Sequence, residues 1–497
     1  MNKILALVIG FIALVYLFTL KGSLGNNTMT MNTPPFETSM ERGRFAQVVA
    51  LAERGTFSVD IFRDYLRPDI AWYNGHFYPA FPPGVSFIAA GAYFIGRYVN
   101  MGQLFATLPT LVASLLTAAV IIQICLELGL GAVAAGLAAI VFCLATPAFP
   151  YSVTLSAHPF SALLTAAMFL TYLVIRKHPD NPWLLLALWF SFAANLFVDY
   201  PNLAITAPIV AVATLHAFFL TPPKGKSQTS VLTKLLFSLA GLAIVLIPFF
   251  IFNELHFGKP IAFTNTYNLK RLTTQGVQFS ESALSNSLFN QKSYAGRFSI
   301  STIPFGIAVL LVSEDRGLFI YAPVLIFLFV GYFFLKKTHN VPAFIIELVF
   351  ILDILIYASF DDPWGGWGFG PRYLIVSLPL IAVLVGVAYE KLIQNKAILK
   401  FIFFVLLIAS IGINLSGALT TNAVPPGVEA IGLNMKDNFL LNIDYLNAGS
   451  SSSFVYNQFL TNVLNPTQYA LTLLSIISVG ILALPWLINK QLHSKQS

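Results

Sequence analysis

Side chains that can move protons and hold anions gather near the N-terminus. Glu41, Asp69 and His76 lie in one stretch with several arginines and aspartates. A positioned carboxylate can take a proton from a hydroxyl group, and an arginine can grip a phosphate through two parallel hydrogen bonds. A solvated loop would have the same composition, and Glu41 would then be only the reciprocal partner of Thr38 in a helix capping box. The stretch predicts an acid–base or anion site, with a plain surface loop as the alternative.

The residues around Asp69 and His76 favour the first interpretation. Asp69 precedes an aromatic run, His76 lies in the sequence Tyr-Asn-Gly-His-Phe-Tyr, and the pair Pro82-Pro83 follows. Proline fixes the backbone, and loops that are held by a scaffold often carry function. We therefore expect both side chains to be held in place.

Arg372, His158 and Asp199 are further candidates. A glycine-rich turn precedes Arg372, so the backbone can come close to a ligand that the guanidinium binds; an arginine that only reaches the membrane surface from a helix end is the alternative. His158 opens an apolar segment, as a substrate contact or as a structural helix-end histidine. Asp199 lies in Asp-Tyr-Pro, which also fits a simple turn.

The composition shows which kind of scaffold carries these residues. The 497-residue chain is 57% hydrophobic with a mean hydropathy of +0.76, and only 10% of its residues are charged, against about 25% in soluble proteins. This is an all-α, polytopic integral membrane protein. The net charge of +7 is spread thinly between apolar runs, which argues against nucleic acid as a partner. Cys125 and Cys143 lie in apolar segments and provide neither a disulfide framework nor a metal site.

Apolar runs of about 20 residues predict membrane-spanning helices. The first run could be a signal peptide, but no Ala-x-Ala-like cleavage site follows it, so we interpret it as an anchor. We expect about twelve spanning helices, at 3–20, 103–127, 131–148, 158–176, 183–199, 201–220, 231–252, 317–336, 341–358, 372–389, 398–416 and 467–487.

Basic residues orient these helices. With the N-terminus in the cytoplasm, the inner segments hold 13 cations and three acids, whereas the outer segments hold 15 cations and 16 acids. Twelve of 17 lysines are then inside and ten of 11 arginines outside. We expect a multi-pass protein of a prokaryotic plasma membrane, with both termini cytoplasmic and the site on the outer face.

The outer segments are the long ones. The first, residues 21–102, should hold an amphipathic helix at 39–54 and an interfacial helix at 84–99. We expect residues 1–416 to form one membrane module that includes this loop. Residues 417–497, an outer loop and the last membrane helix, are left without an assigned role.

Several motifs together resemble the C-type polytopic glycosyltransferases, such as the protein O-mannosyltransferases and the lipid A aminoarabinose transferase. The resemblance runs in order over about the first 390 residues. It rests on the acidic-aromatic first loop, Tyr73-Asn74-Gly75-His76-Phe77-Tyr78, Pro82-Pro83-Gly84, Ser156-Ala157-His158-Pro159, Val198-Asp199-Tyr200-Pro201, His256-Phe257-Gly258-Lys259-Pro260, Arg316-Gly317-Leu318-Phe319-Ile320-Tyr321-Ala322-Pro323 and Trp364-Gly365-Gly366-Trp367-Gly368-Phe369-Gly370-Pro371-Arg372-Tyr373.

The resemblance implies a transfer of a hexose or pentose from a polyprenyl-phosphate carrier to a lipid, glycan or protein acceptor in the cell envelope. By position, Glu41 and Asp69 match the catalytic carboxylates of that family. Relatives commonly have a lysine before the diproline that helps with phosphate, but this chain has Phe81. Another cation would then serve, such as Arg44, Arg316 or Arg372. The substrate-binding residues expected are Arg44, His76, His158, Asp199, Arg316 and Arg372.

The sequence also leaves three other functions open. Glu347 and Asp353 lie within one apolar segment, and intramembrane acids favour an ion-coupled transporter or a lipid flippase. An outer-face glycan polymerase is the third alternative. No Asp-x-Asp motif is present for a nucleotide diphosphate and its metal, and Asp361-Asp362 does not replace it. We expect neither a metal nor a cofactor.

Overall fold

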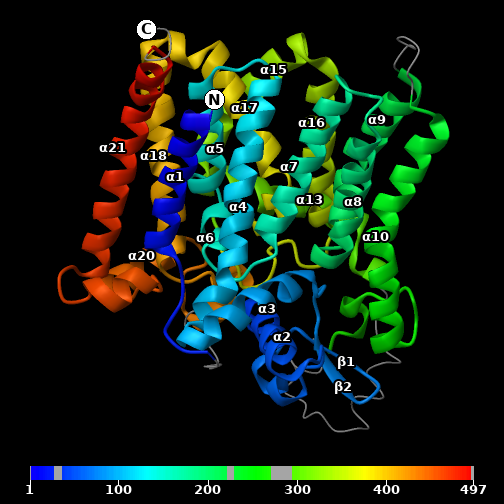
Figure 1. Cartoon of the computed structure of the whole chain (residues 1–497). Helices are drawn as coiled ribbons and strands as arrows, with labels where there is room; N and C mark the ends of the chain where they lie inside the picture. The colour runs from blue at the N-terminus through cyan, green and yellow to red at the C-terminus, as the bar shows by residue number, and fades with distance from the viewer. Residues whose placement is uncertain (1, 27–35, 221–228, 270–293, 494–497) are drawn as a thin grey trace.

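The computed structural model describes residues 2–26, 36–220, 229–269 and 294–493. These residues form a bundle of helices with shorter elements gathered at one end (Figure 1). Eight of the described helices are long and apolar enough to cross a membrane. The predicted all-α membrane architecture is confirmed, while the number twelve is not. The eight are Gly102–Glu127, His158–Ile175, Asn202–Phe219, Val231–Phe257, Asn340–Ala358, Leu378–Asn395, Ala397–Leu419 and Pro466–Ile488.

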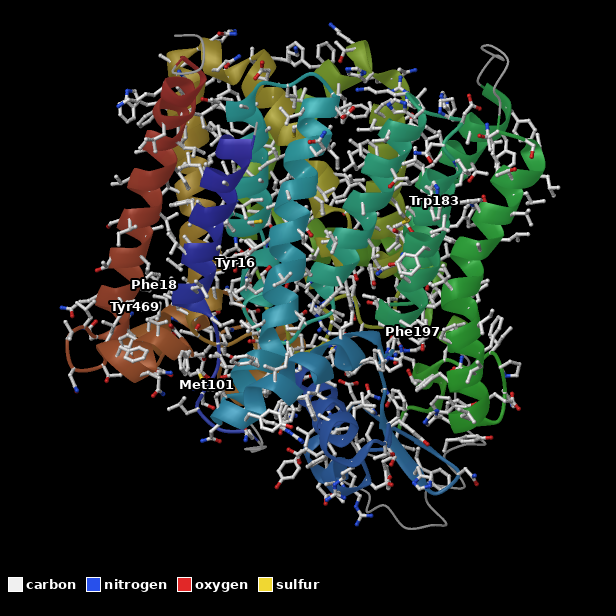
Figure 2. All side chains as sticks on the ribbon, in the orientation of Figure 1. Tyr16, Phe18, Met101, Trp183, Phe197 and Tyr469 are labelled. Atoms are coloured by element: carbon white, nitrogen blue, oxygen red, sulfur yellow. The ribbon has the colours of Figure 1, made fainter. Side chains whose placement is uncertain are left out.

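Shorter apolar helices occupy three further predicted spans. Tyr16 fastens the first of them to its neighbours, because its buried hydroxyl lies 2.8 Å from the hydroxyl of Ser114 and donates to the carbonyl of Cys143 at 3.0 Å (Figure 2). The bundle helices are α1 Asn2–Thr19, α4 Gly102–Glu127, α5 Ala132–Leu144, α7 His158–Ile175, α8 Pro182–Val198, α9 Asn202–Leu215, α10 Val231–Phe257, α16 Asn340–Ala358, α17 Leu378–Lys391, α18 Ala397–Leu419 and α21 Pro466–His493.

The predicted span 317–336 is wrong as one continuous helix. It divides into α14 Leu318–Tyr321, the 3₁₀ segment Pro323–Phe327 and α15 Leu328–Thr338. Pro323 lacks the N–H that would continue the helix, and Ala322 before it leaves the helical region, with φ −142° and ψ 65°. The structure adds α13 at Ile303–Val312, within the region expected to be only an outer loop.

The two helices of the first loop lie where the sequence predicts them, and the structure adds a 3₁₀ helix and a hairpin between them. Helix α2 spans Ser39–Arg54, with Thr38 as N-cap in a complete capping box and Gly55 as a left-handed C-cap. A short 3₁₀ helix follows at Asp60–Tyr65, and then the hairpin of β1 Ile70–Tyr73 and β2 His76–Pro79. Its turn, Asn74-Gly75, has positive φ at both residues, the geometry that two-residue hairpins favour. Helix α3 Gly84–Gly96 continues as a 3₁₀ turn to Val99.

The ends of the bundle differ in content. Both termini lie at one end, and α2, α3 and the hairpin lie at the other (Figure 1). At the end of the termini, Lys177 pairs with Glu127 across two predicted inner segments. The segment after α18 joins the first-loop end through α19 Gly427–Leu433, α20 Leu440–Asn447 and the turn Tyr456–Leu460.

Candidate functional site

Two guanidinium groups meet where the first loop touches the bundle. Arg44, on α2, donates to the backbone oxygen of Met40 at 3.5 Å, and Arg372 donates to the sulfur of the same Met40 at 2.9 Å. Both arginines are buried, and within the described residues the Nε–H of each has no hydrogen-bond partner. A thioether is a weak acceptor, so these donors are poorly satisfied. Two such like charges favour a bound anion.

Arg44 stands beside the residue where the sequence lacks the family's lysine. Its guanidinium carbon lies 5.0 Å from the centre of the Phe81 ring. Burial lowers the pKa of Arg44 to about 10, Asp199 offsets part of this effect, and the charge of Arg372 adds to it. The group stays charged at neutral pH, although it is held in a dry place. Of the three cations expected to serve in place of a lysine, Arg44 is therefore the one that lies over Phe81.

The glycine-rich turn brings backbone against Arg372. Gly365, Gly366 and Gly370 have positive φ of 75°, 61° and 58°. A Cβ on Gly365 would lie 2.7 Å from Nε of Arg372. The carbonyl of Gly365 accepts a hydrogen bond from the Arg372 guanidinium. Only glycine permits both this turn and this close approach, so the motif fixes the position of the Arg372 side chain.

Asp199 is an acidic neighbour of both arginines, and Asp362 and Asp69 also act on Arg372. Asp199 follows α8 and accepts a hydrogen bond from the hydroxyl of Tyr357, whose ring stacks on Tyr373 at 4.1 Å. Burial raises the pKa of Asp199 to about 6, although Arg44 and Arg372 act in the opposite direction. Near neutral pH the carboxylate thus partly balances the two guanidiniums.

His158 opens α7 on the same side. Its ring lies edge to face with Tyr151 at 5.0 Å and within electrostatic reach of Arg372 and Arg44. Tyr151 belongs to the short helix Ala148–Ser152 and accepts a hydrogen bond at 2.8 Å from the backbone N–H of Phe369, in the glycine-rich turn. The short helix Ala148–Ser152 and the start of α7, which follow one another in the chain, therefore both face the arginine pair.

Glu41 is a capping residue in this structure. Its Oε2 accepts from the backbone N–H groups of Glu37 and Thr38, each at 3.2 Å, and its Oε1 accepts from the side-chain amide of Asn422 at 3.3 Å. The side chain is buried. Three N–H donors engage the carboxylate, so its position is fixed by the start of α2 and by Asn422.

Asp69 is less constrained. It is half-buried before β1 and accepts a hydrogen bond from the hydroxyl of Ser39, the first residue of α2. Arg42, Arg44 and Arg372 are all within its electrostatic reach. The structure thus brings Asp69 together with Arg44, Arg372, Asp199 and His158.

Arg316 holds backbone segments together, whereas the sequence predicted that it binds substrate. It is fully buried. Its Nε donates to Trp364, Nη1 to Asp315 and Asp437, and Nη2 to Gly366 and Val424, always to backbone oxygens at 2.8 to 3.2 Å. All five N–H donors are occupied, so this side chain has none left for a phosphate.

His76 lies apart from the arginine pair. It is exposed at the hairpin turn, and its Nδ1 lies 2.9 Å from Oδ2 of Asp60. Asp60 also accepts from the backbone N–H of Phe77 at 2.6 Å. The pair therefore stabilises the hairpin and gives no link between His76 and the other candidates.

Sequence reasoning missed Lys21, the residue two positions after α1. It is buried, donates from Nζ to Oδ1 of Asn422 at 2.9 Å, and lies near Glu37 and Glu41. Burial lowers the pKa of Lys21 to about 8, although the two glutamates raise it. A lysine that directly ends an apolar segment is an ordinary feature of a spanning helix, so nothing in the sequence marked it.

Of the other acidic residues, Glu347 and Asp361 have partners outside this cluster, whereas Asp362 acts on the charge of Arg372. Glu347, on α16, accepts from the hydroxyl of Tyr332, and Asp361 pairs with Arg297 at 2.9 Å. No group of three or more metal-ligating side chains occurs in the described part of the chain. Asp353 is fully buried on α16 and within electrostatic reach of Asp199.

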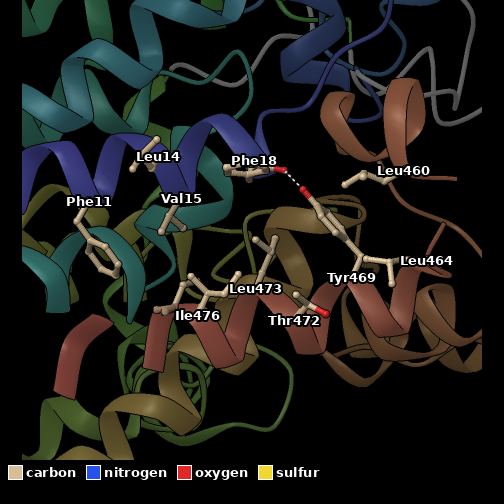
Figure 3. A pocket seen from close by; sticks show the side chains of 11 residues that line it. Phe11, Leu14, Val15, Phe18, Leu460, Leu464, Tyr469, Thr472, Leu473 and Ile476 are labelled. Carbon is tan, nitrogen blue, oxygen red and sulfur yellow. Dashed lines mark hydrogen bonds between the residues drawn. The ribbon is translucent and has the colours of Figure 1, made fainter. Parts of the chain in front are cut away.

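A groove of about 280 Å³ lies between α1 and α21 (Figure 3). At one end of it the hydroxyl of Tyr469 donates to the carbonyl of Phe18 at 2.7 Å. No charged side chain lines it, so the groove suits hydrocarbon. Its lining residues are Phe11, Leu14, Val15, Phe18, Leu460, Leu464, Tyr469, Thr472, Leu473, Ile476 and Ile477.

Comparison with solved structures identifies the fold. The chain is similar to ArnT from Cupriavidus metallidurans, in the apo state with 16% identity and bound to undecaprenyl phosphate with 15%. Each alignment covers 96% of this chain and 76% of ArnT, with a TM-score of 0.51. The oligosaccharyltransferase AglB from Archaeoglobus fulgidus, in complex with an inhibitory peptide and a dolichol-phosphate, aligns at 12% identity over 84% of this chain and 56% of AglB, with a TM-score of 0.44.

No protein-family model and no curated protein matches the sequence. ArnT is a C-type polytopic membrane glycosyltransferase, so the fold expected from the sequence motifs is confirmed.

Proposed function

We propose that this protein is a glycosyltransferase that moves a sugar from a polyprenyl-phosphate carrier to an acceptor hydroxyl. One observation carries the proposal: the buried Arg44 and Arg372 meet at Met40, each with an Nε–H that has no partner among the described residues. Guanidinium groups bind phosphate oxygens through paired N–H donors. The donor phosphate would take the unoccupied Nε–H groups and balance two positive charges.

The reaction needs one base and stabilisation of a leaving phosphate. The bond between the sugar's anomeric carbon and the phosphate oxygen breaks, and a bond from that carbon to the acceptor oxygen forms on the opposite face, with inversion. The electron pair leaves with the polyprenyl phosphate, where Arg44 and Arg372 stabilise the charge that develops. The acceptor proton passes to a carboxylate. No metal is required for these steps, since the arginines carry the needed positive charge.

Asp69 is the carboxylate that we assign as general base. It lies within electrostatic reach of both arginines and is engaged by one hydroxyl donor, that of Ser39. Glu41 is buried and accepts three N–H hydrogen bonds, which suits it to hold the first turn of α2. Of the two carboxylates of the first loop, Asp69 is thus the proposed base. Glu41 fixes the helix that carries Ser39 and Arg44.

Asp199 and His158 complete the proposed donor site. Asp199 balances the arginines when no donor is bound, and His158 faces them from the start of α7. The complex of ArnT with undecaprenyl phosphate supports a lipid-phosphate ligand for this fold. Whether the acceptor is a lipid, a glycan or a protein depends on surfaces beyond this cluster.

The site would face the outside of a prokaryotic plasma membrane. The proposal rests on the lysine-rich segments assigned to the cytoplasm, at the end of the bundle opposite to α2. Both native cysteines are buried, so introduced cysteines report cleanly. A membrane-impermeant thiol reagent should label Asp64→Cys but not Lys337→Cys in intact cells, and the reverse result would invert the topology.

A transfer assay with two donors tests the function. Purified protein in lipid nanodiscs receives cell-envelope acceptors and radiolabelled sugar, carried either by a polyprenyl phosphate or by a nucleotide. We expect product only from the polyprenyl-phosphate donor. Product only from the nucleotide donor, or movement of lipid across vesicles without a glycosidic product, would contradict the proposal and favour another enzyme class or a flippase.

A further inference from the structure

The segment that follows α18 packs against both parts of the candidate site. Residues 420–424, here called the strap, are buried apart from the half-buried Ala423. The strap comes from the region that the sequence left without a role. It contacts the first loop on one side and the glycine-rich turn on the other.

Asn422 is the centre of the contact with the first loop. Its side-chain oxygen accepts from Nζ of Lys21 at 2.9 Å, and its amide nitrogen donates to Oε1 of Glu41 and to the carbonyl of Pro150, each at 3.3 Å. One buried amide therefore joins three segments that are far apart in the sequence. Buried polar groups of this kind are costly to leave unpaired, so the arrangement is specific.

Thr421 makes the second contact with the first loop. Its hydroxyl donates to Oε2 of Glu37, the residue before the N-cap of α2. Asn442, on α20, holds the strap from behind, because its amide donates to the hydroxyl of Thr420 at 2.9 Å and to the carbonyl of Thr421 at 2.7 Å. Burial raises the pKa of Glu37, while Lys21 and the Thr421 hydroxyl lower it.

Val424 makes the contact with the glycine-rich turn. Its carbonyl accepts from the backbone N–H of Gly368 and from Nη2 of Arg316, each at 3.0 Å. Gly368 lies close to Arg372, since a Cβ there would be 3.0 Å from Cδ of that arginine. The strap is thus bonded to the start of α2, which carries Arg44, and to the turn that carries Arg372.

We propose that the strap is a positioning element that sets the two arginines at the spacing which one phosphate requires. The inference rests on the proposed function, because it names what holds that site together. Thr421 and Asn422 fix the first turn of α2, and Val424 fixes the glycine-rich turn. These contacts lie within four consecutive residues, which leaves little slack between them. Lys21 balances the charge of Glu37 and Glu41, so that the contact with α2 is stable when buried.

The test uses four single variants of the full-length protein in nanodiscs. Thr421→Val removes one hydroxyl and Thr421→Ser keeps it, while Asn422→Leu removes both functions of the amide. Thr117→Val is the matched control, because the buried Thr117 hydroxyl bonds to the carbonyl of Ala113 within α4 and not to the strap. Native mass spectrometry gives the Kd for polyprenyl phosphate, steady-state assays give donor KM and kcat, and thermal unfolding reports the folded fraction.

We expect Thr421→Val and Asn422→Leu to raise both Kd and donor KM about tenfold per folded molecule, the size of one lost buried hydrogen bond. Thr421→Ser and Thr117→Val should stay within about threefold of wild type. A loss of melting temperature with unchanged Kd and KM would show a merely structural strap and overturn the inference. If Asn422→Leu does not accumulate, Thr421→Val decides alone.

Different results would contradict this inference and the proposed function. Wild-type protein that binds polyprenyl phosphate without transferring sugar would contradict the function. The Kd values of the strap variants, compared with that of wild type, would still test the role of the strap. Wild type that transfers sugar, with Thr421→Val equal to it in Kd and KM, would contradict only the strap. Wild type that neither binds nor transfers would contradict both.

Discussion

Arg44 and Arg372 share one neighbour, Met40, although Arg372 lies 332 positions beyond it in the sequence. Each guanidinium is buried and keeps an Nε–H without a partner in the described structure. Holding two like charges together away from water costs free energy that a bound anion offsets. This relationship carries the account of a lipid-phosphate site.

Removing either guanidinium should weaken donor binding. Arg44→Gln and Arg372→Gln are each expected to raise donor KM by about 10- to 100-fold, the range for charge-assisted hydrogen bonds. Arg372→Lys should recover only part of the loss, because an ammonium keeps the charge but loses the planar fork. Arg63→Gln serves as control, since the Arg63 side chain is 52% exposed and pairs only weakly with Asp64 at 4.0 Å. Equal KM values in all four variants would exclude the pair from donor binding.

The two first-loop carboxylates should separate by kinetics. Asp69→Asn removes the proposed base and should lower kcat at least about 100-fold. Glu41→Gln keeps the capping box and the shape, so its kcat should stay within about tenfold of wild type. Both variants should reach the membrane in normal amounts, as checked by fluorescence-detected size exclusion. The opposite order would make Glu41 the base, and near-normal turnover in both would direct attention to Asp64 and Asp199.

Asp199 should make donor binding depend on pH. Its pKa is raised to about 6, so it is neutral below that pH and negative above it. The ionised carboxylate competes with the donor phosphate for Arg44 and Arg372. Donor KM should therefore rise as pH increases from 5 to 7, and Asp199→Asn should flatten this profile with a low KM throughout. A wild-type KM that falls over this range would have the wrong sign.

Arg316 should matter for stability rather than for donor binding. Arg316→Leu takes a donor from five backbone carbonyls. The Val424 carbonyl keeps the N–H of Gly368, and each of the others that is left buried and unsatisfied costs about 1–3 kcal/mol. We expect a clear drop in melting temperature, or loss from the membrane. Arg316→Lys should be intermediate, with a donor KM close to wild type in the fraction that folds. A stable Arg316→Leu protein with raised KM would reverse the assignment.

Much of the scaffold could be predicted from local signals. Helix α2 begins and ends at the predicted residues, because Thr38, Glu41 and Gly55 act through contacts within a few residues of one another. Pro323, by contrast, interrupts an apolar run that hydropathy alone treats as one span. Hydropathy measures whether a segment tolerates lipid and does not detect a missing backbone donor.

The site could be predicted only where the residues that shape it lie close together in the sequence. The glycines before Arg372 indicated a tight turn, and their positive φ angles bear this out. The contacts of Lys21, Thr421 and Asn422 join segments about 400 residues apart, and no periodicity or local motif encodes such a pairing. For the same reason Arg316 resembled a ligand in the sequence, because four of its five backbone acceptors come from distant chain.

A density map of the protein with polyprenyl phosphate in nanodiscs tests the central claim most directly. The account predicts phosphate density within hydrogen-bonding distance of the Nε atoms of both Arg44 and Arg372, with the lipid chain leading from it into the membrane. Phosphate density elsewhere on the protein, with the arginine pair still packed on Met40, would contradict it.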